Sequence, residues 1–240
     1  VVAGFAVAAK KGIEFDDSMR KVKATSGATG EEFEALKKKA REMGATTKFS
    51  ASDSAEALNY MALAGWDSKQ MMEGLSGVMD LAAASGEELG AVSDIVTDGL
   101  TAFGLKAKDS GHLADVLAQT SSKANTDVRG LGEAFKYVAP VAGALGYTIE
   151  DTSIAIGLMS NAGIKGEKAG TALRTMFTNL SSPTRAMGNE MERLGISITD
   201  SNGKMIPMRK LLDQLREKFK HLSKDQQASS AATIFGKEAM

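Results

Sequence analysis

The stretch Leu63-Ala64-Gly65-Trp66-Asp67-Ser68-Lys69-Gln70 contains both an end signal and a start signal for a helix. A glycine followed at once by an apolar residue, as in Gly65-Trp66, is typical of a left-handed residue that closes a helix while the next side chain folds back on the last turn. Asp67, with Gln70 three residues later, is typical of a capping box that begins a new helix. The stretch therefore predicts two helices joined by a tight turn.

Glycine ends most of the helical segments that the sequence predicts. Six glycines follow segments with helical periodicity, and five of them are followed at once by an apolar residue. The predicted helix caps are Gly44, Gly65, Gly104, Gly146, Gly163 and Gly195. Three of these glycines recur at intervals of roughly 40 residues, which indicates either helix-pair repeats or an irregular helical array.

The segments between these signals predict an all-α fold, an irregular array of about ten to twelve short helices with glycine caps. Further start signals lie at Ser85, Ser182 and Ser223. Pro140 predicts a kink or break in its helix. The predicted helices span 5–24, 30–43, 53–64, 68–84, 86–103, 109–121, 127–145, 149–162, 166–181, 183–194, 207–220 and 224–235.

A small β-hairpin is the one β candidate, near residues 196–206. Ile196-Ser197-Ile198 alternates apolar and polar residues, Asp200-Ser201-Asn202-Gly203 is a turn sequence, and Lys204-Met205-Ile206 forms the return segment. A lone hairpin is marginally stable, so we expect it to be stabilised by packing against neighbouring helices.

Three parts are predicted along the chain. Residues 1–26 form an N-terminal helix, residues 27–195 a helical core, and residues 196–240 the hairpin candidate with the C-terminal helices. The chain starts without methionine and stops shortly after Gly236. We therefore interpret it as a piece of a longer protein, with sequence missing before Val1 and after Met240.

The composition is that of a folded globular protein without an evident active site. Of the 240 residues, 43% are apolar and 25% are charged, and the net charge is −1, so the chain has no global basic field for nucleic acid. There is no cysteine, and the only histidines are His112 and His221, which excludes thiol chemistry and a histidine-rich metal site. We expect no catalytic residues, no cofactor and no metal.

One segment has a composition similar to that of a nucleotide-binding loop. The segment Gly163–Thr171 is rich in glycine and lysine but lacks the Gly-Lys-Ser/Thr ending of a nucleotide-binding loop, and no strand precedes it. We interpret it as a helix end followed by a closely packed helix start.

No apolar run reaches the ~18–20 residues that span a bilayer.

Charge is distributed unevenly along the chain. Residues 61–120 contain three basic and nine acidic residues, whereas residues 121–240 contain sixteen basic and twelve acidic ones. One interpretation is ordinary solvated helix faces. The other is complementary docking between halves of the chain or between copies.

A methionine-rich face is the candidate interaction surface. Methionine packs adaptably, so such a face suits either a core or a groove that binds partners. Val1–Ala9 is a second apolar candidate. The face consists of Met71, Met72, Leu75, Val78 and Met79.

The order of several short motifs resembles the conserved region of tail tape-measure proteins from long-tailed bacteriophages and prophages. Each motif is weak alone, but eight in the same order are specific, and the resemblance runs from Phe15 to Phe235. The motifs are Thr25–Phe33, Gly44–Ala51, Leu63–Gly65, Leu81–Gly86, Ala102–Leu105, Tyr137–Ala142, Asn161–Gly166 and Ala169–Arg174.

The resemblance implies a structural protein of the virion tail that is present in the host cytoplasm during assembly. Such proteins occupy the tail tube, set its length and leave ahead of the DNA during infection. It implies tail tube proteins, tail-tip proteins, tail assembly chaperones and further copies as partners, no sequence-specific nucleic acid, and membrane contact only outside this segment. It carries over no catalytic residues.

Two other functions stay open beside this one. An unrelated helical adaptor or scaffold has the same general composition. A membrane-active helical domain would use the apolar runs Val1–Ala9 and Val138–Leu145.

Overall fold

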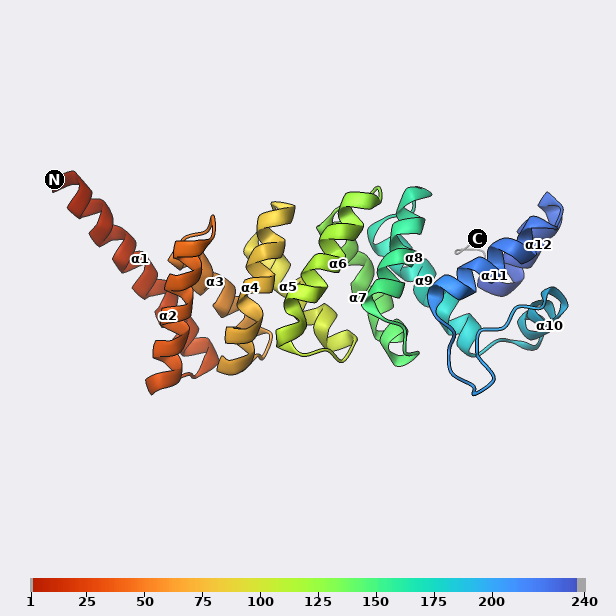
Figure 1. Cartoon of the computed structure of the whole chain (residues 1–240), viewed down its shortest axis with the longest axis horizontal. Coiled ribbons are helices and arrows are strands. Elements are labelled where there is room, and N and C mark those ends of the chain that lie inside the picture. Colours follow the sequence, from red (N-terminus) through yellow and green to blue (C-terminus); the bar gives the residue numbers. More distant parts are fainter. Residues whose placement is uncertain (1, 237–240) are drawn as a thin grey trace. The chain divides into compact units, whose positions relative to one another are not determined.

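The computed structural model describes the backbone of residues 2–236 and the side chains of residues 9–236. Within this part, the chain forms twelve α-helices, one short 3₁₀ helix and no strand (Figure 1). The all-α class is confirmed, and each predicted helical segment overlaps one observed helix. The helices are α1 (Val2–Ser26), α2 (Gly30–Thr46), α3 (Ala51–Leu63), α4 (Ser68–Ser85), α5 (Leu89–Ala102), η1 (Ala107–Asp109), α6 (Ser110–Lys123), α7 (Val128–Ala144), α8 (Ile149–Asn161), α9 (Gly166–Ser181), α10 (Arg185–Leu194), α11 (Met208–Lys220) and α12 (Lys224–Phe235).

The chain divides into two compact units, Val1–Ala118 and Gln119–Met240. The boundary lies inside α6 and inside the segment 27–195, which the sequence analysis treats as one helical core. Each unit has its own buried side chains, and each is described separately below.

In the first unit, α3 is the central helix. It packs against α1, α2, α4 and α5. Aliphatic and thioether side chains such as Leu58, Met61 and Leu75 fill the core and are 0% exposed. Between α1 and α2, the Lys37 ammonium lies 3.0 Å from a carboxylate oxygen of Asp16.

In the second unit, α7 and α9 pack closely side by side. Gly170 makes this possible, because a Cβ atom there would overlap the backbone of Ala134. Tyr147 stacks on Phe177 with 5.0 Å between ring centroids, and burial raises the pKa of Tyr147 to about 12. α12 packs against α9 and α10, while α11 contacts α8.

Five of the six glycines predicted as caps have left-handed backbones. Gly65 has φ 85°, and the amide of Trp66 beyond it donates to the carbonyl of Met61 at 3.1 Å. This bond is the six-to-one link of a Schellman motif. The Trp66 ring then lies against Gly74 of α4, where a Cβ atom would overlap it. The other four left-handed glycines are Gly104 (φ 65°), Gly146 (80°), Gly163 (92°) and Gly195 (65°).

The predicted cap at Gly44 is wrong. Gly44 lies inside α2, which continues to Thr46, and its φ is not positive. The glycine is needed for a different reason, because a Cβ atom would overlap the backbone of Ala51 where α3 begins. Ala45 follows it, so this glycine also lacks the large apolar residue that follows each of the five left-handed caps.

Of the four predicted start signals, two are observed as predicted and two lie elsewhere. The capping boxes at Asp67 and Ser223 are present. Ser85 instead ends α4, with Gly86 left-handed beyond it, and α5 has Glu88 as its N-cap. The cap of α10 is Thr184, two residues after Ser182.

The proline and the hairpin candidate each have a smaller effect than the sequence predicts. Helix α7 runs through Pro140 without a break, with the proline exposed on its outer side. Near residues 196–206, a single antiparallel bridge joins Thr199 and Met205, and the amide of Ile206 donates to the carbonyl of Ile198 at 2.9 Å.

We predict opposite effects for two glycine-to-alanine changes in the second unit. Gly163→Ala places a Cβ atom at a positive φ, so it should lower the free energy of unfolding by about 1 kcal/mol. Gly188→Ala is the control, because Gly188 lies inside α10 with nothing within 4 Å of an added Cβ. It should raise stability by about 0.5–1 kcal/mol. Urea unfolding of both variants measures this, and equal effects would contradict the role of the left-handed cap.

Candidate interaction surfaces

The predicted methionine face is core and not an interaction surface. Met71, Leu75 and Met79 are 0% exposed, as is Val78, and Met72 is partly buried. Helices α2, α3, α5 and η1 all pack against α4. The apolar stripe on α4 is thus covered by other helices of this chain. Most of the second candidate, Val1–Ala9, lies outside the described side chains.

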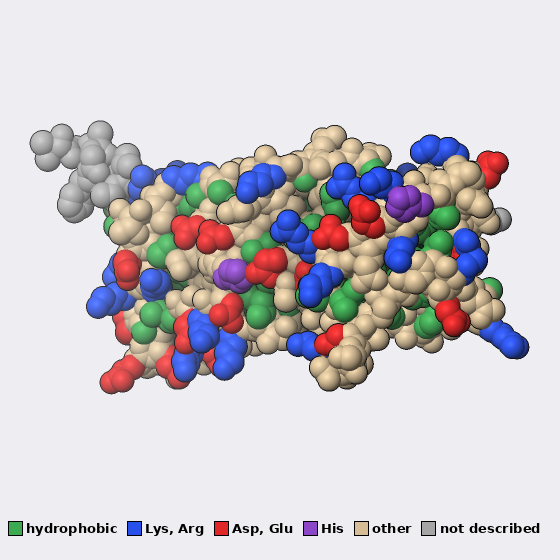
Figure 2. Space-filling model, turned by 45° about the vertical axis from the view of Figure 1, so that its right-hand side comes forward, with side chains coloured by type: hydrophobic (Ala, Val, Ile, Leu, Met, Phe, Trp, Pro, Cys, Tyr) green, Lys and Arg blue, Asp and Glu red, His purple; other side chains and the backbone are tan. Residues whose placement is uncertain are grey.

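Large apolar side chains are rarely exposed in the described part of the chain. On the face shown in Figure 2, hydrophobic side chains are scattered among charged and polar ones and form no large patch. The exposed large hydrophobic residues are Ile13, Leu63, Ile154 and Leu158. Charged surfaces are therefore the better candidates for recognition.

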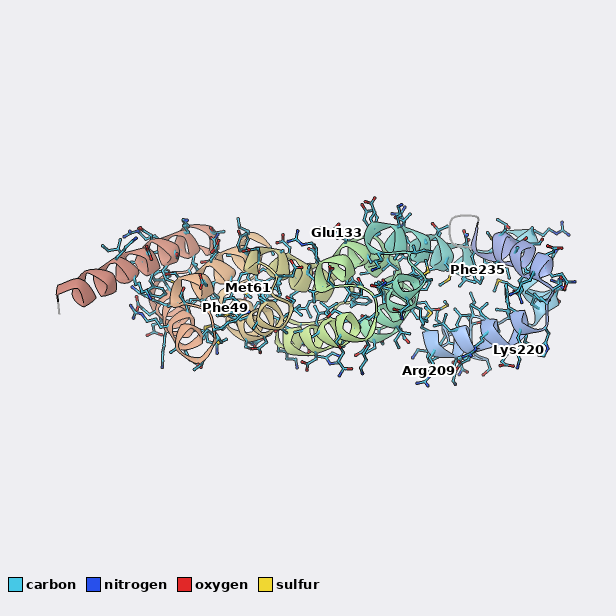
Figure 3. All side chains as sticks on the ribbon, turned by 90° about the horizontal axis from the view of Figure 1, so that it is seen from above. Phe49, Met61, Glu133, Arg209, Lys220 and Phe235 are labelled. Atoms are coloured by element: carbon cyan, nitrogen blue, oxygen red, sulfur yellow. The ribbon has the colours of Figure 1, made fainter. Side chains whose placement is uncertain are left out.

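An acidic groove lies in the first unit, between the start of α3, the end of α4 and the start of α5. Its volume is about 710 Å³. Phe49, labelled in Figure 3, and Tyr60 supply aromatic surface. Lys48 is the one basic residue among the lining side chains. The acidic lining residues are Asp53, Glu56, Glu87, Glu88 and Asp94.

The groove already holds one ammonium group of this chain. The Lys48 ammonium donates to the carbonyl oxygen of Ala83 at 3.1 Å and lies 5.2 Å from the centroid of the Phe49 ring. Ala83 is in the last turn of α4, where helix carbonyl groups carry partial negative charge. Carboxylates, a helix C-terminus and an aromatic face together favour cations.

Helix α11 in the second unit has the opposite character. Its apolar side is anchored by the buried Met208 and Leu211. Figure 3 labels Arg209 and Lys220, which lie near its two ends. Two acidic residues, Asp213 and Glu217, share its outer surface. Its exposed basic residues are Arg209, Lys210, Arg216, Lys218 and Lys220.

A smaller polar pocket of about 440 Å³ lies where α7 and α9 begin. Its polar groups bond to one another. The Lys165 ammonium donates to the side-chain oxygen of Asn125 at 2.7 Å, and the backbone N–H of Asn125 donates to the side-chain oxygen of Asn161 at 2.8 Å. The pocket thus ties α8 and α9 to the start of α7, and the segment Gly163–Thr171 forms a helix junction.

No metal-binding cluster emerges from the described residues. No group of three or more histidine or acidic side chains is placed to hold a metal ion in that part of the chain. His112 lies in α6 and His221 follows α11, so they belong to different units. No described helix is long and apolar enough to cross a membrane.

One ionic network joins α10 to α12. The guanidinium of Arg193 donates to both carboxylate oxygens of Glu190, at 2.9 and 2.6 Å, and the buried hydroxyl of Ser230 donates at 2.6 Å. The hydrogen bonds from Arg193 and Ser230 lower the pKa of Glu190 to about 2. The carboxylate therefore stabilises this corner of the unit in its charged form.

These features define an all-helical protein whose large apolar residues are mostly buried in the described part of the chain and whose candidate interaction surfaces are charged. The chain belongs to the family of phage-related minor tail proteins, because the model of that family matches residues 37–236. No solved structure matches the chain.

Individual relatives agree with this family. The chain is 41% identical over 238 residues to the tape measure protein of Pneumococcus phage Dp-1, covering 99% of this chain and 21% of that protein. It is 32% identical over 232 residues to the probable tape measure protein of Escherichia phage P2, covering 95% of this chain and 28% of that protein. The chain thus spans about a quarter of the length of these relatives.

We predict that Glu190→Gln reduces the loss of unfolding free energy that the chain undergoes at acid pH. The folded-state pKa lies below the usual value of 4.5, so the stabilisation is present above about pH 4.5 and is lost as pH falls towards 2. Chemical unfolding over a pH series should show a smaller loss in the variant than in the parent chain. Glu192→Gln, on the exposed side of the same helix, is the control and should behave like the parent. If Glu190→Gln lost as much unfolding free energy at acid pH as the parent chain, this would contradict the role of the network.

Proposed function

We propose that this chain is part of a tape measure protein that acts in tail assembly, in tail length determination and in genome ejection of a bacteriophage or prophage. The observation that carries the proposal is 41% identity to a tape measure protein over 99% of the chain. The match of residues 37–236 to the minor tail protein family supports the same structural role. We propose no enzymatic activity and no cofactor.

The proposed partners are tail tube and tail-tip proteins, tail assembly chaperones and further copies of the chain. The proposed location is the virion tail, reached from the host cytoplasm during assembly. The family and the names of the relatives support a place in the tail. The charged surfaces support partner binding by complementary charge, which steers association and selects partners.

We further propose that this segment is a folded assembly module and that regions outside it mainly set the tail length. A ruler of continuous helix advances about 1.5 Å per residue. This chain instead reverses at left-handed glycines such as Gly65 and Gly146, and each unit buries its own core. Compact units convert residues into length far less efficiently than a single rod does.

Antibody labelling tests the location. An antibody raised against this chain should decorate phage tails in electron micrographs once the tail interior is opened. Absence of label from the opened tails, with label elsewhere, would support the adaptor or scaffold alternative. Release of dye from liposomes by the purified chain would support the membrane-active alternative.

An in-frame deletion in the intact phage tests the module. Removal of Asp109–Ser121 from a ruler should shorten the tail by about 20 Å at helical rise. We expect normal tail lengths or failed assembly instead, because this deletion removes most of α6 and disrupts a packed unit. Tail lengths measured by microscopy decide the question. Proportional shortening, repeated with a deletion of Ile149–Ala162, would show that the segment is a ruler.

A further inference from the structure

We propose that the acidic groove of one copy binds helix α11 of a second copy, so that copies associate head to tail. The acidic groove is the 710 Å³ cavity lined by Lys48, Phe49, Tyr60 and five acidic residues. This inference rests on the self-association included in the proposed function, and it names the surfaces that perform it.

The groove offers carboxylates that have no partner of their own. The side chains of Glu56, Glu88 and Asp94 are exposed and make no hydrogen bond or ion pair within the described part of the chain. Lys48, bound to the carbonyl of Ala83 beside the Phe49 ring, shows how an ammonium group is held there. A second basic side chain entering the groove would meet the same carbonyl end of α4 and the free carboxylates.

Helix α11 offers the matching cations. Its five exposed basic side chains form no ion pair among the described residues, so their charge is available to a partner. The helix runs for 13 residues, which corresponds to about 20 Å. The groove volume is below the roughly 1,000 Å³ occupied by two helical turns with side chains. Helix α11 would therefore lie across the opening of the groove, with its long basic side chains inserted into the groove.

The other basic helix, α2, is a poorer match. Lys37 pairs with Asp16 at 3.0 Å, and Lys39 lies 3.6 Å from Glu42. The guanidinium of Arg41 lies over the Phe15 ring, 5.0 Å from its centroid. Three of its cations are already engaged within the first unit, which favours α11 as the helix that fills the groove.

A contact between two different surfaces has a consequence for assembly. Each copy presents one groove and one α11, so binding does not saturate at a two-fold dimer. Such heterologous contacts build rings where the rotation closes and open chains where it does not. Because the contact is ionic and exposed, salt should weaken it.

Charge reversal in the groove tests the proposal on the purified chain. Sedimentation velocity should show concentration-dependent association that high salt suppresses. Glu56→Lys with Asp94→Lys should raise the dissociation constant at least about tenfold. Glu73→Lys with Asp80→Lys is the matched control, with the same change in net charge on the exposed side of α4. Circular dichroism checks that both variants are folded.

Mixing variants tests the head-to-tail geometry. Arg216→Glu with Lys220→Glu should likewise raise the dissociation constant of self-association at least about tenfold. A mixture of this variant with the groove variant should form a complex of one copy each, because one intact groove then meets one intact α11. A chain that stays monomeric at every concentration, a groove variant that associates like the control, or a mixture that forms no complex would overturn the proposal.

The test separates this inference from the proposed function. A salt-sensitive change in sedimentation that is independent of concentration would place the contact within one chain and overturn the binding of a second copy. Antibody label on tails with no association of the purified chain would retain the tail role and remove this contact. Association as described, without label on tails, would retain the contact and remove the tail role.

Discussion

The structure depends on the hydrogen bond that closes a helix beyond a left-handed glycine. At Gly65, the amide of Trp66 reaches back to the carbonyl of Met61, and the Trp66 side chain turns onto the following helix. The reversal takes two residues, so the next helix begins with its apolar stripe already against the previous one. Repeated along the chain, this turn converts the sequence into short helices packed side by side, and the helix packing follows from it.

Such turns are local, which explains why the sequence predicts the helices well. α3 and α8 both start with a hydroxyl cap, Ser50 or Thr148, and end in the same glycine motif. All the information for these ends lies within a few neighbouring residues. Gly44 differs, because its role is set by the close approach of Ala51 on the next helix, which no local pattern encodes. Pro140 also lies inside α7, which continues past it to Ala144 and packs against α8 and α9.

The surfaces were harder to predict than the helices. Periodicity shows that one side of α4 is apolar, but it does not show that α2, α3, α5 and η1 cover that side, so from the sequence the methionine face stays a candidate for either core or a partner groove. The acidic groove combines Glu56 on α3 with Asp94 on α5, residues that only tertiary packing brings together. The acidic bias of residues 61–120 was the visible signal, and it located the charge without revealing the cavity.

In the described part of the chain, burial of nearly all large apolar side chains leaves mainly charged and polar groups at the surface. A protein that exposed its methionine face would associate through the hydrophobic effect, which salt does not weaken and which favours aggregation. Contacts between carboxylates and ammonium groups are instead reversible and selective, and opposite charges speed the encounter of copies. In this chain the apolar residues stabilise each unit from within, while the exposed carboxylates and ammonium groups carry their charge at the surface, an arrangement that favours ionic over hydrophobic association.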